Sequence, residues 1–218
     1  MYVLNDYKIN NELEAIKDIS YKKITENVYI NDLLMAYSWD DELYLHSYNV
    51  AQLSFAIGYL YGIDENTLAE IYIGAMLHDI GKLGLDKKIL YKNGRLTARE
   101  KMYVQEHPEL GYRILKARGV KGIPLDIVRY HHEKLDGTGY PSKLFNENIS
   151  APVRIVTVAD MFEAMTADRC YRKKIDQQIV IELLNSNNGV DKEIVEILKD
   201  ALGYIENITA EEMLSAAN

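Results

Sequence analysis

Residues 71–83 read IYIGAMLHDIGKL, and this stretch decides the fold that the sequence predicts. Ile71, Ala75 and Met76 recur at helical spacing, so they form the apolar face of a helix. The polar pair His78-Asp79 follows at once, and Gly81 then loosens the chain. The stretch therefore predicts a helix that ends beside a chemically reactive pair.

Helical spacing continues on both sides of this stretch. Residues 41–61 keep apolar side chains near helical spacing, and Asp64 is placed to cap the helix that runs towards Ile80. Thr97 and Glu100 form a capping box. Further helices are expected to begin or to be capped at Pro108, Pro124, Pro152, Asp176, Asp191 and Thr209. No segment alternates with a period of two residues between hairpin turns, so we expect an all-α fold.

Composition limits the classes of function. The chain has 218 residues, 48% of them hydrophobic, which fits residues 39–218 as one main domain after a short N-terminal helical addition over residues 1–38. A net charge of −8 and a pI near 5.2 argue against binding to DNA or RNA. The single cysteine, Cys170, excludes an intrachain disulfide and favours the reducing cytoplasm. No run of about 18 apolar residues occurs, so we expect no membrane span.

Imidazoles and carboxylates recur beside one another along the chain. The candidate metal ligands are Glu42, His46, His78, Asp79, His107, His131, His132 and Asp160. Glu42 lies one helical turn before His46, and Asp160 interrupts an apolar stretch where a carboxylate is costly to bury unless it is paired or binds a metal. Nitrogen and oxygen ligands without thiolate suit iron, manganese or zinc. Two such ions about 3.5–4 Å apart can hold a hydroxide for attack on phosphorus.

Simpler interpretations stay open at this point. A single histidine on a helix is more often a surface or core residue than a ligand, and Asp160 can pair with Arg154. Lys82 lies three residues after Asp79, so it faces the same side if the helix continues through Gly81. It would then reach a substrate phosphate or assist the leaving oxygen.

Five ordered motifs resemble those of a known family. They are HSYNVA at 46–51, LHDIGKL at 77–83, EHPELGYRIL at 106–115, HHEKLDGTGYP at 131–141 and RIVTVADMFEAMTADRCYR at 154–172. Their order and spacing resemble the HD-GYP family of HD-domain phosphohydrolases over about residues 41–202. The resemblance implies an HD-domain helical bundle with a metal site in its core.

The resemblance also implies an activity and a ligand set. The family consists of phosphodiesterases that hydrolyse a cyclic dinucleotide, cyclic di-GMP above all, to pGpG or GMP by means of a metal-bridging hydroxide. The family's ligands match His46, His78, Asp79, His107, His131, His132 and Asp160. Asp79 matches the bridging carboxylate. Glu42 occupies the place of a glutamate found in three-metal members, so two or three divalent ions are implied, iron or manganese, with three favoured.

Further residues match positions that contact the substrate. Lys82 matches the lysine at the scissile phosphate, Arg169 matches an arginine near a guanine or phosphate, and Arg172 is a second candidate. Cys170 departs from the pattern, since the family often has proline there, and we expect a free thiol.

The GYP segment consists of Gly139, Tyr140 and Pro141. In the family it shapes a loop beside the site, so the resemblance makes these three residues candidates for binding the substrate. The segment has also been linked to contacts with diguanylate cyclases. The alternative is a loop stiffened by Pro141 that has no partner role. Residues 142–148 lack the glycine that often follows this segment, which leaves the conformation of the loop open.

Two other functions remain as alternatives. An HD-type phosphohydrolase for another nucleotide, such as cGAMP, would share the metal site and differ in the pocket for the bases. A non-catalytic module that binds a cyclic dinucleotide would be expected to have lost ligands, whereas every expected ligand is present here.

Overall fold

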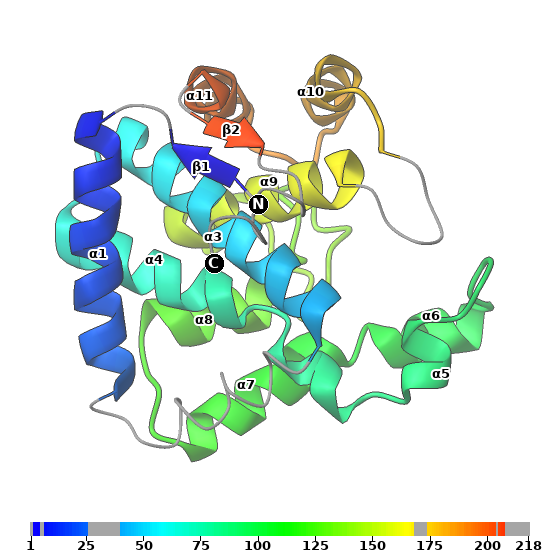
Figure 1. Cartoon of the computed structure of the whole chain (residues 1–218). Coiled ribbons are helices and arrows are strands. Elements are labelled where there is room, and N and C mark those ends of the chain that lie inside the picture. Colours follow the sequence, from blue (N-terminus) through cyan, green and yellow to red (C-terminus); the bar gives the residue numbers. More distant parts are fainter. Residues whose placement is uncertain (1, 5–6, 26–39, 168–173, 204, 208–218) are drawn as a thin grey trace.

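The chain folds as a helical bundle, which confirms the expected all-α class (Figure 1). The computed structural model describes residues 2–4, 7–25, 40–167, 174–203 and 205–207. Its α-helices are α1 (Tyr7–Thr25), α3 (Asp41–Tyr61), α4 (Glu65–Leu77), α5 (Lys87–Leu90), α6 (Ala98–Val104), α7 (His107–Ala117), α8 (Ile123–Tyr130), α9 (Ala151–Thr166), α10 (Gln177–Ser186) and α11 (Lys192–Leu202). Two 3₁₀ helices, η1 (Ile80–Gly84) and η2 (Asn146–Asn148), lie between them.

One small sheet adds to the helices. Strand β1 (Tyr2–Leu4) pairs antiparallel with β2 (Ile205–Asn207). The sequence did not predict this pair, because three residues are too few for an alternating pattern and the partners come from opposite ends of the described chain.

The expected caps explain where several helices begin. The Asp64 side chain accepts a hydrogen bond from the Thr67 amide at 3.1 Å, and Thr97 and Glu100 bond reciprocally as a capping box. Asp176 and Asp191 cap α10 and α11. Each cap satisfies an amide that the first helical turn leaves without a partner. The cap expected at Thr209 lies outside the described residues.

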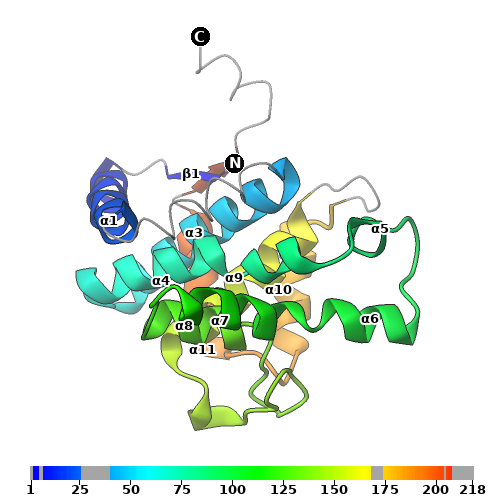
Figure 2. The same cartoon turned by 90° about the horizontal axis from the view of Figure 1, so that it is seen from below.

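Helix α3 runs through the centre of the bundle (Figures 1 and 2). It packs on α4, α9 and α11, and α1 covers α4 from outside. Leu53 and Phe55 of α3 are fully buried in the main core, which also takes up Leu13 and Ile16 of α1. The division of the chain between residues 38 and 39 stays a prediction. Among the described helices, none is both long and apolar enough to cross a membrane.

Helix α4 ends earlier than expected. The sequence predicted a helix towards Ile80, but α4 stops at Leu77 and the chain continues as η1. The Lys82 amide donates to the Asp79 carbonyl at 2.9 Å, which is the tighter spacing of a 3₁₀ turn. His78 and Asp79 therefore occupy the junction between the two helices and point into the core, where both are buried.

Helices α5 and α6 project from one side of the bundle (Figures 1 and 2). They pack on each other, and α6 leads directly into His107 at the start of α7. This arm therefore borders the region where the candidate ligands meet.

Candidate metal centre

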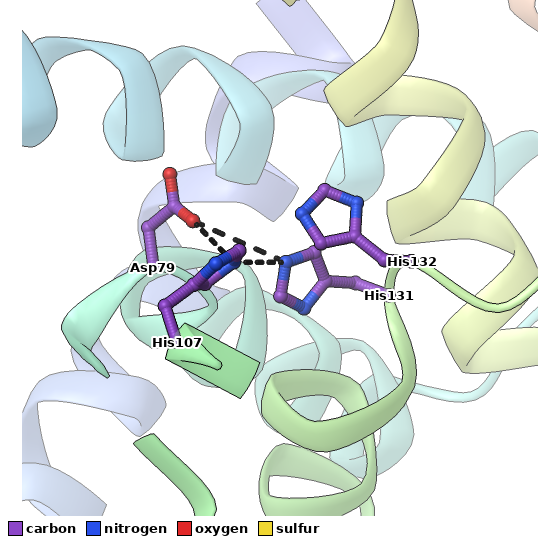
Figure 3. A group of neighbouring side chains, drawn as sticks. All are labelled: Asp79, His107, His131 and His132. Atoms are coloured by element: carbon purple, nitrogen blue, oxygen red, sulfur yellow. Dashed lines mark hydrogen bonds and ion pairs between the residues drawn. The ribbon is translucent and has the colours of Figure 1, made fainter. Parts of the chain in front are cut away.

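Imidazoles and carboxylates from five parts of the bundle converge at one buried point. The Nε2 atom of His46 lies 3.1 Å from Oδ1 of Asp160, and that of His78 lies 3.4 Å from Oδ2 of Asp79. His107 places its Nε2 atom 3.2 Å from Oδ1 of Asp79. Figure 3 shows Asp79 facing His107 and His131, with His132 beside them. Residues more than 100 positions apart in the chain thus meet, as the motifs predicted.

Helix ends orient three of the rings. The Nδ1 atom of His78 donates to the Ala75 carbonyl at 2.7 Å, and that of His131 donates to carbonyls in the last turn of α8 at 3.1 Å. His107 donates in the same way to Val104, the last residue of α6, at 2.8 Å. Carbonyls in the last turn of a helix can accept such a bond, and a histidine that donates Nδ1–H to one directs Nε2 away from the helix.

These bonds fix the tautomer and leave lone pairs facing one another. Because Nδ1 of His107 carries the proton, Nε2 presents a lone pair, only 3.3 Å from Nε2 of His131 and 3.2 Å from the Asp79 oxygen. Within the described residues, His78 Nε2 and Asp79 Oδ1 are buried and make no hydrogen bond. Converging lone pairs repel unless a cation lies between them, so these residues fit a metal ion.

The ligand atoms form more than one group. In each of three sets, the ligand atoms lie within 4.8 Å of one another. The sets are Asp79 with His107, His131 and His132; His46 with His78 and Asp79; and His78 with His131 and Asp160. Asp79 belongs to two of these sets and directs a different oxygen towards each. Such an arrangement suits a carboxylate that bridges two ions.

The charges of the site suit metal binding at neutral pH. Burial opposes ionisation of Asp79, but Lys82 and the neighbouring histidines outweigh it and hold the pKa of this carboxyl well below its usual value. Burial, together with neighbouring imidazoles, lowers the pKa of His131 well below its usual value and that of His132 to about 3. The aspartate is therefore ionised and these two rings are neutral, as metal coordination requires.

His46 differs from these two rings. Burial lowers its pKa, but the carboxylates of Asp160 and Glu163 outweigh burial and raise the pKa to about 9. A metal ion that binds Nε2 of this ring must displace a proton, so binding at this ligand strengthens as the pH rises.

Lys82 lies at the edge of the cluster. Its ammonium contacts Oδ2 of Asp79, although α4 ends at Leu77 and the condition under which we expected this contact, a helix that continues through Gly81, is not met. The 3₁₀ turn of η1 keeps the two side chains on one side at a spacing of three residues. Lys82 also lines a pocket of about 180 Å³ together with Glu42 and His46.

Other predicted residues lie less centrally. Glu42 lines that pocket, but it belongs to none of the three ligand sets, and its role as a ligand stays a prediction. Arg169, Cys170 and Arg172 lie outside the described residues. The simpler interpretation of Asp160 as a partner of Arg154 is wrong, because Arg154 pairs with Asp191 at 3.1 Å.

The GYP segment packs directly against the ligands. Tyr140 stacks on His132 with ring centroids 4.8 Å apart, and its amide donates to the His132 carbonyl at 3.2 Å. A Cβ atom on Gly139 would come within 2.5 Å of the backbone of Glu133 and Lys134, so only glycine fits this approach. Pro141 is exposed. The segment thus holds the ring of a candidate ligand in place.

Two buried acids at the site were missed from the sequence. Glu163 contacts Nδ1 of His46, and Glu133 accepts hydrogen bonds from the amides of Ser142 and Leu144 after the GYP segment. Glu163 lies one helical turn after Asp160 in an apolar stretch, and Glu133 follows the histidine pair directly. An acidic residue within an apolar stretch, or directly beside a histidine pair, was the sequence signal that could have identified these two residues.

Fold and site together define the class: an all-α protein that encloses a buried histidine–aspartate centre able to bind metal ions. A family model described as "HD domain" matches residues 31–194. The chain belongs to the HD domain family, and the resemblance of its motifs to the HD-GYP subgroup is confirmed.

Curated relatives and solved structures agree with this membership. The chain is 32% identical over 192 residues to the cyclic di-GMP phosphodiesterase PA4108 of Pseudomonas aeruginosa, covering 87% of this chain and 46% of that protein. It is 36% identical over 157 residues to the 3′3′-cGAMP-specific phosphodiesterase 2 of Vibrio cholerae, and the match covers 70% of this chain and 30% of that protein. The chain thus spans less than half the length of these curated relatives. The structure of Bd1817, an HDG"Y"P protein from Bdellovibrio bacteriovorus, shares the fold with a TM-score of 0.65 at 16% identity, covering 89% of this chain and 69% of that one.

Proposed function

We propose that this protein is a metal-dependent phosphodiesterase that hydrolyses a cyclic dinucleotide. Cyclic di-GMP is the first candidate substrate. The observation that carries the proposal is the set of lone pairs that His78, Asp79, His107 and His131 direct at one another in the core. 3′3′-cGAMP is the second candidate, because a curated relative at 36% identity bears the name of a 3′3′-cGAMP-specific phosphodiesterase.

The residues have distinct parts in this reaction. Divalent ions, when bound, would supply an activated water and neutralise charge on the scissile phosphate. Asp79 and the histidines would hold these ions in position. Because the rings of His131 and His132 are neutral, an ion displaces no proton when it binds to them. The Lys82 ammonium lies close enough to stabilise negative charge on the phosphoryl oxygens or to protonate the leaving oxygen.

Pockets on two sides of the cluster offer room for the two nucleotides. One of about 410 Å³ is lined by His131, His132 and Tyr140, and by the side chains of Lys101 and Lys134. The smaller one, of about 180 Å³, contains Lys82. A cyclic dinucleotide carries a second phosphate besides the scissile one, and the two lysines of the larger pocket are suited to bind it.

Changing Lys101 to alanine is expected to raise the KM for the cyclic dinucleotide about ten-fold, because one charge-assisted contact to the second phosphate is lost. The turnover number should change little. Arg99→Ala is the matched control, since it removes a charge from the same helix at a position that does not line the pocket. Steady-state kinetics with the dinucleotide and with bis(p-nitrophenyl) phosphate separate the effects, because the small ester has no second phosphate for Lys101 to bind. An equal loss with both substrates would contradict the assignment.

The proposed activity is tested with a panel of cyclic dinucleotides. Anaerobically purified protein, loaded with Mn²⁺ or Fe²⁺, is incubated with cyclic di-GMP, 3′3′-cGAMP and cyclic di-AMP, and products are separated by chromatography. We expect cyclic di-GMP to be opened to pGpG, with or without GMP. Tight binding without turnover in metal-loaded protein would instead favour a binding module.

Finer features belong to the same proposal. We expect two or three ions per chain, iron or manganese, with Glu42 as the added ligand of a third. Arg169 and Arg172 are proposed to contact the substrate. A contact between the GYP segment and a diguanylate cyclase would involve the exposed Pro141, because Gly139 and Tyr140 pack inward. The cytoplasm is the proposed location, because a chain with a single cysteine suits a reducing compartment.

A further inference from the structure

Among the four buried histidines His46, His78, His107 and His131, one is held differently from the other three. The Nδ1 atoms of His78, His107 and His131 donate to backbone carbonyls. Nδ1 of His46 instead contacts a carboxylate oxygen of Glu163. A carboxylate partner makes the opposite nitrogen of an imidazole a stronger donor to a metal than a carbonyl partner does.

Glu163 is itself firmly placed. Its side chain is 2% exposed, and its other oxygen accepts a hydrogen bond from the Asn49 side chain at 3.1 Å. Asn49 follows His46 by three residues on α3, so the two side chains lie on the same face of that helix, and Glu163 of α9 contacts both. Burying this carboxylate is costly unless its oxygens are bonded, and these two partners supply the bonds.

The same helix presents two acids to the same ring. Asp160 lies one turn before Glu163 and places Oδ1 3.1 Å from Nε2 of His46. The ring is therefore held at both nitrogens by α9, and it cannot rotate without breaking the Glu163 contact. This fixes Nε2 towards His78 and Asp79, with which it forms one of the ligand sets.

We propose that Glu163 is a positioning residue that, with Asn49, orients His46 and sets the metal affinity of the position formed by His46, His78 and Asp79. The inference rests on the proposed function only in assuming that the centre binds metal ions. It distinguishes this position from the one near His107, His131 and His132. There, Nδ1 of His107 and of His131 donates to backbone carbonyls, and Nδ1 of His132 lies 4.0 Å from Oδ2 of Asp160, beyond hydrogen-bond distance. Loss of Glu163 therefore affects the ions unequally.

The test measures metal binding without substrate. Metal-free protein is titrated with Mn²⁺, and free Mn²⁺ is followed by electron paramagnetic resonance. Glu163→Gln keeps the shape of the side chain and removes its charge. In this variant we expect one ion per chain to bind about 10- to 100-fold more weakly, while the affinity for the remaining Mn²⁺ is unchanged. Glu163→Ala should weaken the same ion at least as much. Glu182→Gln, an exposed glutamate on α10, is the control and should bind as the unchanged chain does.

Each outcome decides for or against the proposal. Equal weakening of every ion, or wild-type binding in Glu163→Gln, would overturn it. A lower melting temperature with unchanged Mn²⁺ binding would also overturn it, since that is the result of a purely structural role. Because no nucleotide is present, the answer is independent of the dinucleotide panel: unchanged protein that binds Mn²⁺ but cleaves nothing would refute the proposed activity and leave this inference intact.

Discussion

Changing Asp79 to alanine is expected to abolish metal binding and hydrolysis together. Its two oxygens face different ligand sets, so the substitution removes a ligand from both at once. A metal ion contributes several kcal/mol to stabilising charge at phosphorus, so we expect kcat/KM to fall at least about 1,000-fold. Elemental analysis of anaerobically purified protein and hydrolysis of the cyclic dinucleotide, measured on one preparation, check both parts.

Matched variants separate charge from shape. Asp79→Asn keeps the size of the side chain and removes its charge, so it should fold and still lose metal. Asp18→Ala removes an exposed aspartate from α1 and should change neither quantity. Circular dichroism verifies that each variant is folded. Full activity in folded Asp79→Ala would refute the mechanism.

The ligands were predictable because the chain contains so few histidines. With five of them, each beside other histidines, acids or family motifs, the sequence was enough to propose which side chains meet. His46 and His107, 5% and 1% exposed, then lie in the core with His78 and His131. Helix caps were predictable for a similar reason, since Asp64 and Thr97 act through amides only a few residues away.

Interactions that depend on tertiary packing were not predictable. Glu163 and Asn49 meet across α9 and α3, and no local pattern specifies which buried acid faces which ring. Glu133 accepts hydrogen bonds from the amides of a loop whose conformation the sequence left open. The end of α4 at Leu77 was also predicted wrongly, because the chain there adapts to contact with α7 rather than to helix propensity.

Gly81 makes that contact with α7 possible, and Gly81→Ala is expected to destabilise the protein strongly. A Cβ atom at this position would lie 2.0 Å from the His107 carbonyl oxygen and 2.6 Å from the Gly111 amide nitrogen. Both atoms belong to the backbone, so no side-chain rotation relieves the overlap. Overpacking of this kind costs about 3 kcal/mol or more, a large part of the roughly 5–15 kcal/mol that stabilises a typical domain. The free energy of unfolding from urea titration measures the loss.

The same displacement should reach the metal centre. Asp79 precedes η1 and His107 begins α7; their side chains approach to 3.2 Å, and the two segments are in close backbone contact at Gly81. Folded Gly81→Ala should therefore bind Mn²⁺ more weakly as well. Gly84→Ala is the matched control in the same 3₁₀ helix, where a Cβ atom would meet only a Leu110 side-chain carbon at 3.8 Å. If the two variants unfolded at the same urea concentration and bound Mn²⁺ equally, close backbone contact at Gly81 would not be what brings Asp79 to His107.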